Sequence, residues 1–186
     1  MKRLLVWVAF LGALSCSDSS GPGIGGSVAF TYTGGGGGSF NAAGDAPSFI
    51  ASPPTATSWA VGYVQAGETF IGASSPRGGG RVDLAILRIQ RTTVGSENID
   101  AACNIDGDAA CTGVELSLNF NGNGDTGDFF CGLTSGTIVV TEMSSSRAKG
   151  TFSGSGNCIA GTGGAVTGFS VSNGTFDVAL VAPPPA

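Results

Sequence analysis

The carboxylates are the side chains of this 186-residue chain best suited to acid–base chemistry, because the sequence contains no histidine. Without histidine, a Ser-His-Asp triad and histidine-ligated zinc or copper are excluded. Paired carboxylates could still act as acid and base, as they do in glycosidases. Glu115 and Glu142 are the two glutamates inside strand-like segments, and nothing in the sequence sets them opposite each other. We therefore predict a protein that is not an enzyme, with a carboxylate-dependent glycan hydrolase as the alternative.

Two acidic loops, 104–108 and 121–128, carry oxygen-bearing side chains at every second position, as calcium loops do. Neither loop has the glutamate that closes an EF-hand, and Asn, Asp and Gly are also ordinary turn residues. We expect plain loops and no cofactor. The alternative is calcium bound by Asp106, Asp108, Asp125 and Asp128.

Basic and aromatic residues offer two further candidate sites. Arg77, Arg81, Arg88 and Arg91 lie close together in the chain. We interpret them as charges that protect an edge strand, with a site for an anionic ligand or partner as the alternative. Trp59 and Tyr63 are four residues apart in a strand-like segment and so share a face. A place in the core is expected for both, and a sugar-stacking platform is the alternative.

The first fifteen residues have the features of an export signal, with Lys2 and Arg3 followed by an apolar run over 4–14 that is too short to span a bilayer. The end of this segment, Ala13-Leu14-Ser15-Cys16, resembles the lipobox of bacterial lipoproteins. The resemblance implies that Cys16 is lipidated and becomes the new N-terminus. Ser17 implies sorting to the outer membrane, with the protein facing the periplasm or the surface. An ordinary cleaved signal is the alternative.

Loss of the signal would leave six basic residues against thirteen acidic ones. An acidic chain without a basic stripe lacks the charges that neutralise phosphates, so we expect no nucleic-acid partner. The expected partners are the membrane, reached through the lipid, and a protein or glycan of unknown identity.

The composition favours strands joined by tight turns, since glycine contributes 33 residues and charged residues only 11%. We predict an all-β fold, a mainly antiparallel β-sandwich of about ten short strands with no helix after the signal. Residues 16–27 would be the lipidated cysteine and a flexible tether, 28–181 a single domain, and 182–186 a Pro-rich tail. The predicted strands are 28–33, 39–43, 58–64, 69–73, 82–90, 114–120, 128–133, 137–143, 148–153, 166–171 and 175–181.

One short phrase, Gly then a small hydroxyl residue then Phe, recurs at Gly38–Phe40, Gly150–Phe152 and Gly174–Phe176. We interpret it as strand chemistry, with Gly at a turn or strand entrance, the hydroxyl facing water and Phe starting the buried face. Together with the lipobox, the segment 136–181 with its two GTF strands resembles a group of small bacterial β-sandwich lipoproteins of unassigned function. That resemblance implies no catalytic residues.

Four cysteines follow Cys16, and an even number in an exported protein indicates disulfides. A hairpin with its turn near Ser144–Ser145 would place Cys131 opposite Cys158. Cys103 and Cys111 would then form the second bridge across the acidic loop between them. We expect no zinc site, because no C-x-x-C spacing is present.

Overall fold

The computed structural model describes residues 25–45, 57–103, 109–120, 127–161, 164 and 166–183. These residues contain ten strands and no helix, so none of them forms a helix able to cross a membrane. The strands are β1 (Gly26–Thr33), β2 (Gly38–Gly44), β3 (Trp59–Gln65), β4 (Glu68–Gly78), β5 (Arg81–Ile89), β6 (Gly95–Asn98), β7 (Gly113–Phe120), β8 (Phe129–Met143), β9 (Arg147–Ala160) and β10 (Val166–Val181). The all-β prediction is confirmed.

All ten strands belong to one sheet, and seven of them close into a ring in the order β10-β3-β4-β5-β7-β8-β9. β1 and β2 extend the sheet from β10, and β6 pairs with β8. Every pairing is antiparallel except a two-residue parallel contact between β10 and β3. The predicted sandwich is therefore corrected to a closed seven-stranded barrel with extra strands.

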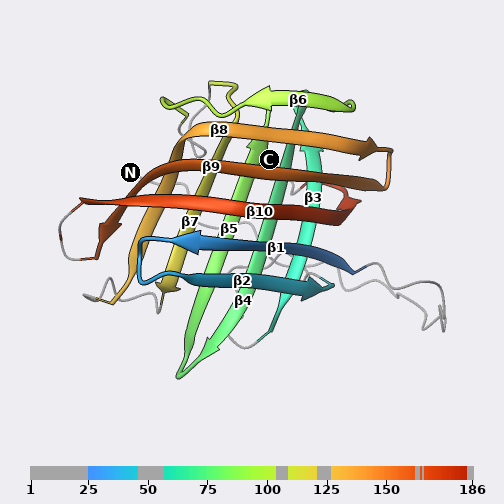
Figure 1. Cartoon of the computed structure of the whole chain (residues 1–186). Helices are drawn as coiled ribbons and strands as arrows, with labels where there is room; N and C mark the ends of the chain where they lie inside the picture. The colour runs from blue at the N-terminus through green and yellow to red at the C-terminus, as the bar shows by residue number, and fades with distance from the viewer. Residues whose placement is uncertain are drawn as a thin grey trace, which may run out of the picture.

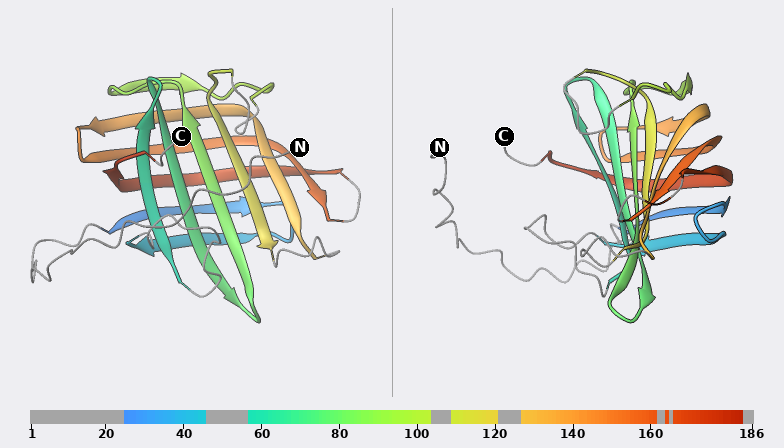
Figure 2. Two further views of the ribbon diagram at one scale, coloured as in Figure 1. Left: turned by 180° about the vertical axis from the view of Figure 1, so that it is seen from behind. Right: turned by 90° about the vertical axis from the view of Figure 1, so that its left-hand side faces the viewer.

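Two layers of strands nevertheless cross each other in space (Figure 1). One layer contains β3, β4, β5 and β7, and the other contains β1, β2, β9 and β10 (Figure 2). The long strand β8 joins the layers, because it pairs with β7 of one layer and with β9 of the other. This shared strand closes one side of the ring, and the short parallel contact between β10 and β3 closes the other.

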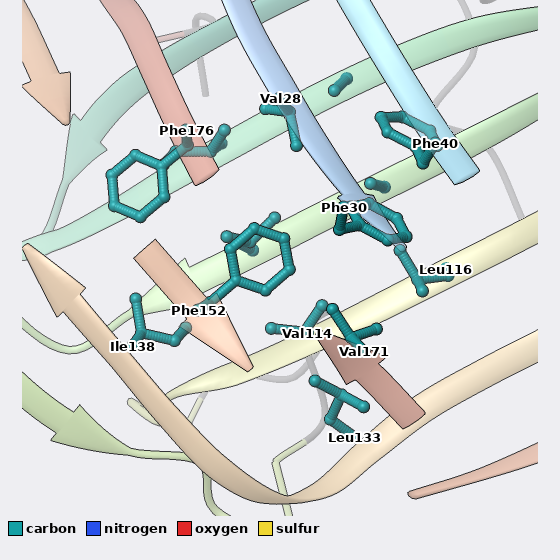
Figure 3. Close-up of a cluster of buried hydrophobic side chains, with 14 of the residues drawn as sticks. Val28, Phe30, Phe40, Val114, Leu116, Leu133, Ile138, Phe152, Val171 and Phe176 are labelled. Carbon is teal, nitrogen blue, oxygen red and sulfur yellow. The ribbon is translucent and has the colours of Figure 1, made fainter. Parts of the chain in front are cut away.

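The core lies between the layers and is built from the inward-facing residues of the alternating strands. Phe30 and Phe40 stack with ring centroids 4.7 Å apart, and Phe152 meets Phe30 edge-on at 5.6 Å (Figure 3). On β10, Phe176 and Val178 are buried and Leu180 packs against the core, whereas Thr175 is exposed. From Thr175 to Val178 this strand therefore alternates between solvent-facing and buried residues.

At two places the sequence predicted a break between strands, but the structure has one continuous strand with an irregularity in its pairing. The predicted strands 128–133 and 137–143 are one strand, β8, with register shifts at Leu133/Ser135 and Val140/Glu142. Likewise 166–171 and 175–181 are joined in β10, where Asn173 has a positive φ of 53°. Bulges accommodate such residues without ending a strand. The short strand β6 has no counterpart in the prediction.

The interpretation of the GTF phrase is confirmed for its phenylalanines and hydroxyl residues, but not for all of its glycines. All three of its phenylalanines are buried, and its hydroxyl residues Ser39, Thr151 and Thr175 are exposed. Gly38 does begin a strand, but Gly150 and Gly174 lie inside β9 and β10. The prediction of a turn or strand entrance is wrong for these two glycines, which face bulky partners on the neighbouring strand.

Candidate functional site

The outer face of β3, β4 and β5 is turned away from the other layer (Figure 2, left). It nevertheless carries large apolar side chains. Strand alternation sends Ala60, Ile71 and Leu87 inward, where they are buried. It sends Trp59 and Tyr63 outward, where both are half-buried. Their predicted common face is confirmed, and their predicted place in the core is wrong.

A first hollow of about 280 Å³ lies on this face, above the backbone of Gly72. Its walls are Trp59, Tyr63, Phe70, Leu84 and Ile86. The indole of Trp59 lies over Gly72, because a β-carbon built on this glycine would stand 3.3 Å from indole Cζ3. Glycine at position 72 therefore makes room for the ring to lie against the sheet.

A buried ion pair lies next to the aromatic wall of this hollow. Arg88 and Glu68 are both almost fully buried, and Arg88 Nη2 donates to Glu68 Oε2 at 2.7 Å. The Arg88 guanidinium stands 5.3 Å from the centre of the Phe70 ring, which in turn stacks on Tyr63 at 5.0 Å. Burial raises the pKa of the Tyr63 hydroxyl, and the Arg88 charge opposes that shift. The aromatic pair is thus fixed in position by Arg88.

A second hollow of about 280 Å³ adjoins the first, with Leu84 and Ile86 lining both. It extends over β7 and β8 to Glu115, Ser117 and Phe130, above Gly132. Ile86, Phe130 and Ile159 are 40%, 43% and 48% exposed, which is high for large apolar residues. Phe130 and Ile159 are direct cross-strand partners. We call the two hollows together the outer-face groove.

Sequence reasoning missed four residues of the groove, Phe70, Leu84, Ile86 and Phe130. A signal that could have located two of them lies in β5. β5 has apolar residues on both faces, with Leu84 and Ile86 outward and Ala85 and Leu87 inward. A continuous apolar run of this kind is typical of a strand covered on both sides. Here the outer side borders the groove.

The four arginines do not protect an edge strand, because β4 and β5 each have a paired strand on both sides. Each arginine is ion-paired with its own carboxylate: Arg77 with Asp83, Arg81 with Asp128, Arg88 with Glu68, and Arg91 with Glu97. The edge strand β2 is covered differently, since the hydroxyl of Ser58 accepts from the Ala43 amide and that of Ser75 donates to the Asn41 carbonyl. The arginines therefore fix strands within the fold.

The calcium alternative involves one residue that the structure describes, Asp128. It is fully buried, and its Oδ1 accepts from Arg81 Nη1 at 3.0 Å. Asp106, Asp108 and Asp125 lie outside the described residues. Within the described ranges, no three acidic or cysteine side chains gather as metal ligands would.

The structure does not bring Glu115 and Glu142 together. Glu115 lines the second hollow opposite Gly132 of β8, and Glu142 lies ten residues further along that strand, opposite Lys149. Ten residues correspond to roughly 30 Å of strand. Catalytic carboxylates of glycosidases stand about 5–10 Å apart, which this arrangement does not provide.

Both predicted disulfides are present. Cys131 and Cys158 are bonded directly across β8 and β9, with their Cα atoms 4.0 Å apart. Cys103 and Cys111 are bonded with a Cα separation of 5.4 Å. Two such bridges are typical of proteins that fold in an oxidising, extracytoplasmic compartment.

Cys16, the predicted lipidation site, lies outside the described residues. Comparison of the chain with protein-family models, with curated proteins and with solved structures finds no match.

Proposed function

We propose that this protein is a non-enzymatic binding module of the bacterial cell envelope, anchored through lipid on Cys16, and that the outer-face groove is its binding surface. The observation that carries the proposal is the gathering of exposed and half-exposed apolar residues around two adjoining hollows. Contiguous apolar surface on a water-exposed face is typical of interaction sites.

The separation of Glu115 from Glu142 supports binding over hydrolysis, because the two carboxylates cannot flank one bond. The two disulfides support an exported protein. The export signal and the lipobox-like end at Cys16 support anchoring at the outer membrane. A binding module held at the envelope accounts for these features together.

The proposal is tested by replacing Phe130 with the photo-cross-linker p-benzoylphenylalanine in living cells. Phe130 suits the purpose because the residue is 43% exposed and lines the groove, and the replacement keeps a phenyl ring. Thr151, exposed on β9 in the other layer, is the matched control position. We expect an irradiation-dependent adduct from position 130 and none from position 151. Equal labelling at the two positions, or none at either, would contradict the groove as the binding surface.

A further inference from the structure

The two hollows of the outer-face groove differ in chemistry, and the difference indicates a class of ligand. The first presents mainly rings and aliphatic side chains, and the second adds the Glu115 carboxylate and the Ser117 hydroxyl. We propose that the groove binds a neutral oligosaccharide of at least two sugar rings. This inference rests on the proposed binding function and specifies its ligand.

The ligand must be recognised by side chains, because the strands under the groove offer no free backbone edge. Gly72 on β4 lies between Val61 of β3 and Ile86 of β5. Glu115 on β7 lies between Ile86 of β5 and Gly132 of β8. A peptide that binds by adding a strand needs an unpaired edge, so this mode of binding is closed here.

The first hollow suits the apolar face of a sugar ring. Its aromatic walls are fixed, with Trp59 lying over Gly72 and Tyr63 stacked on Phe70. Fixed aromatic walls offer a large contact area at little cost in side-chain entropy. The C–H groups on one face of a pyranose make contacts of this kind, while its hydroxyls point to the rim.

The charges at the groove favour a neutral, hydroxyl-rich ligand over an anionic one. Arg88, which contacts the Phe70 ring, is almost fully buried and ion-paired with Glu68. Glu115 lines the second hollow and contributes carboxylate oxygens, which can accept hydrogen bonds from hydroxyl groups. Sugar hydroxyls donate to carboxylates in charge-assisted hydrogen bonds, which are stronger than neutral ones.

The spacing of the hollows sets a minimum ligand length. The first is centred over β4 and the second over β7 and β8, with β5 between them. Their centres are thus about two strand spacings, or roughly 10 Å, apart. A ligand that fills both hollows must contain more than one ring.

Tryptophan fluorescence provides a direct assay, because Trp59 is the only tryptophan after Trp7 of the predicted signal. The protein is titrated with maltohexaose, cellohexaose, xylohexaose and chitohexaose. We expect a saturable change in Trp59 emission with at least one of them. Gly132→Leu should weaken that binding about tenfold or more, because the new side chain fills the second hollow.

Gly132→Leu is a clean test, since a β-carbon at position 132 meets no atom within 4 Å and the change leaves every groove side chain in place. Thr151→Leu, on the other layer, is the control and should bind like the parent. Melting temperatures establish that both variants are folded. Absence of saturable binding to all four sugars, or equal affinity of the two variants, overturns the oligosaccharide proposal.

The outcomes also separate this inference from the proposed function. A protein adduct at position 130 together with no sugar binding rejects the oligosaccharide and keeps the binding module. Failure of both experiments rejects both proposals. Saturable sugar binding that Gly132→Leu weakens and Thr151→Leu does not supports both.

Discussion

Phe176 packs directly on Gly150, its cross-strand partner, so that a β-carbon on Gly150 would overlap the phenyl ring. Phe152 and Gly174 repeat this relationship on the same two strands. Each GTF phrase therefore supplies the glycine that receives the phenylalanine of the other. Aromatic rings that cover a facing glycine in this way fix the register of a strand pair.

This reciprocal packing predicts that Gly150→Ala destabilises the protein. The added methyl group would overlap the Phe176 ring and the Val139 carbonyl, and overpacking of this kind typically costs about 1–3 kcal/mol. Gly132→Ala, made in the neighbouring strand where the methyl group meets open space, is the control. Urea unfolding should show a lower midpoint for Gly150→Ala than for Gly132→Ala. Equal midpoints would mean that the ring and the glycine are not in contact.

The two disulfides should contribute unequally to stability. In the chain-entropy model, closing the 27-residue separation of Cys131–Cys158 contributes about 3.5 kcal/mol, against about 2.5 kcal/mol for the 8-residue separation of Cys103–Cys111. Replacing the first pair with alanines should lower the melting temperature more than replacing the second. A reversed order would argue that strain or residual structure outweighs loop entropy here.

Low pH should weaken the ion pairs that Asp177 of β10 makes with Arg147 and Lys149 of β9. Arg147, 2.6 Å away, holds the pKa of Asp177 below its usual value, burial opposes this shift, and Lys149 adds to it. Since the folded-state pKa is the lower one, the stabilisation is present above the unfolded pKa of about 3.9 and is lost as pH falls below it. Asp177→Asn should therefore flatten the dependence of unfolding free energy on pH below about pH 4. An unchanged slope would show that the ion pair does not contribute.

The anchor is tested at Cys16. If this residue carries the lipid, Cys16→Ala should move the protein from the membrane fraction to the soluble fraction and abolish acyl labelling. Cys103→Ala removes a different cysteine and should leave both properties unchanged. Persistent labelling of Cys16→Ala would contradict the lipoprotein proposal.

The hairpin of β8 and β9 shows how far sequence reasoning reaches. Its turn runs from Ser144 to Arg147, one residue later than predicted, and Met143 faces Ala148. Two register shifts in β8 then move the pairing back by two positions in total, so that Cys131 faces Cys158. The prediction reached the right pair because the later turn and the two register shifts cancel. The number of bulges in a strand cannot be read from its local sequence.

The candidate site was less predictable than the strands. Alternation correctly placed Trp59 and Tyr63 on one face, but it does not say which face of a strand points inward when both are apolar. That choice depends on the closure of the ring, which turns Ala60 and Ile71 toward the core. Ring closure follows from contacts between distant strands, and these contacts leave no local pattern in the sequence.

The pairing of β1 with β10 joins residues that are far apart in the chain, as Ser27 opposite Asp177 shows. Until β10 has been synthesised, β1 can therefore form its strand pairing with β2 but not with β10. Topologies dominated by distant contacts fold slowly, because the chain must close long loops before the contacts form. The sheet therefore cannot be completed until β10 is available to pair with β1. If the chain is exported as proposed, this delay would keep it unfolded during its passage across the membrane, until β10 can pair with β1.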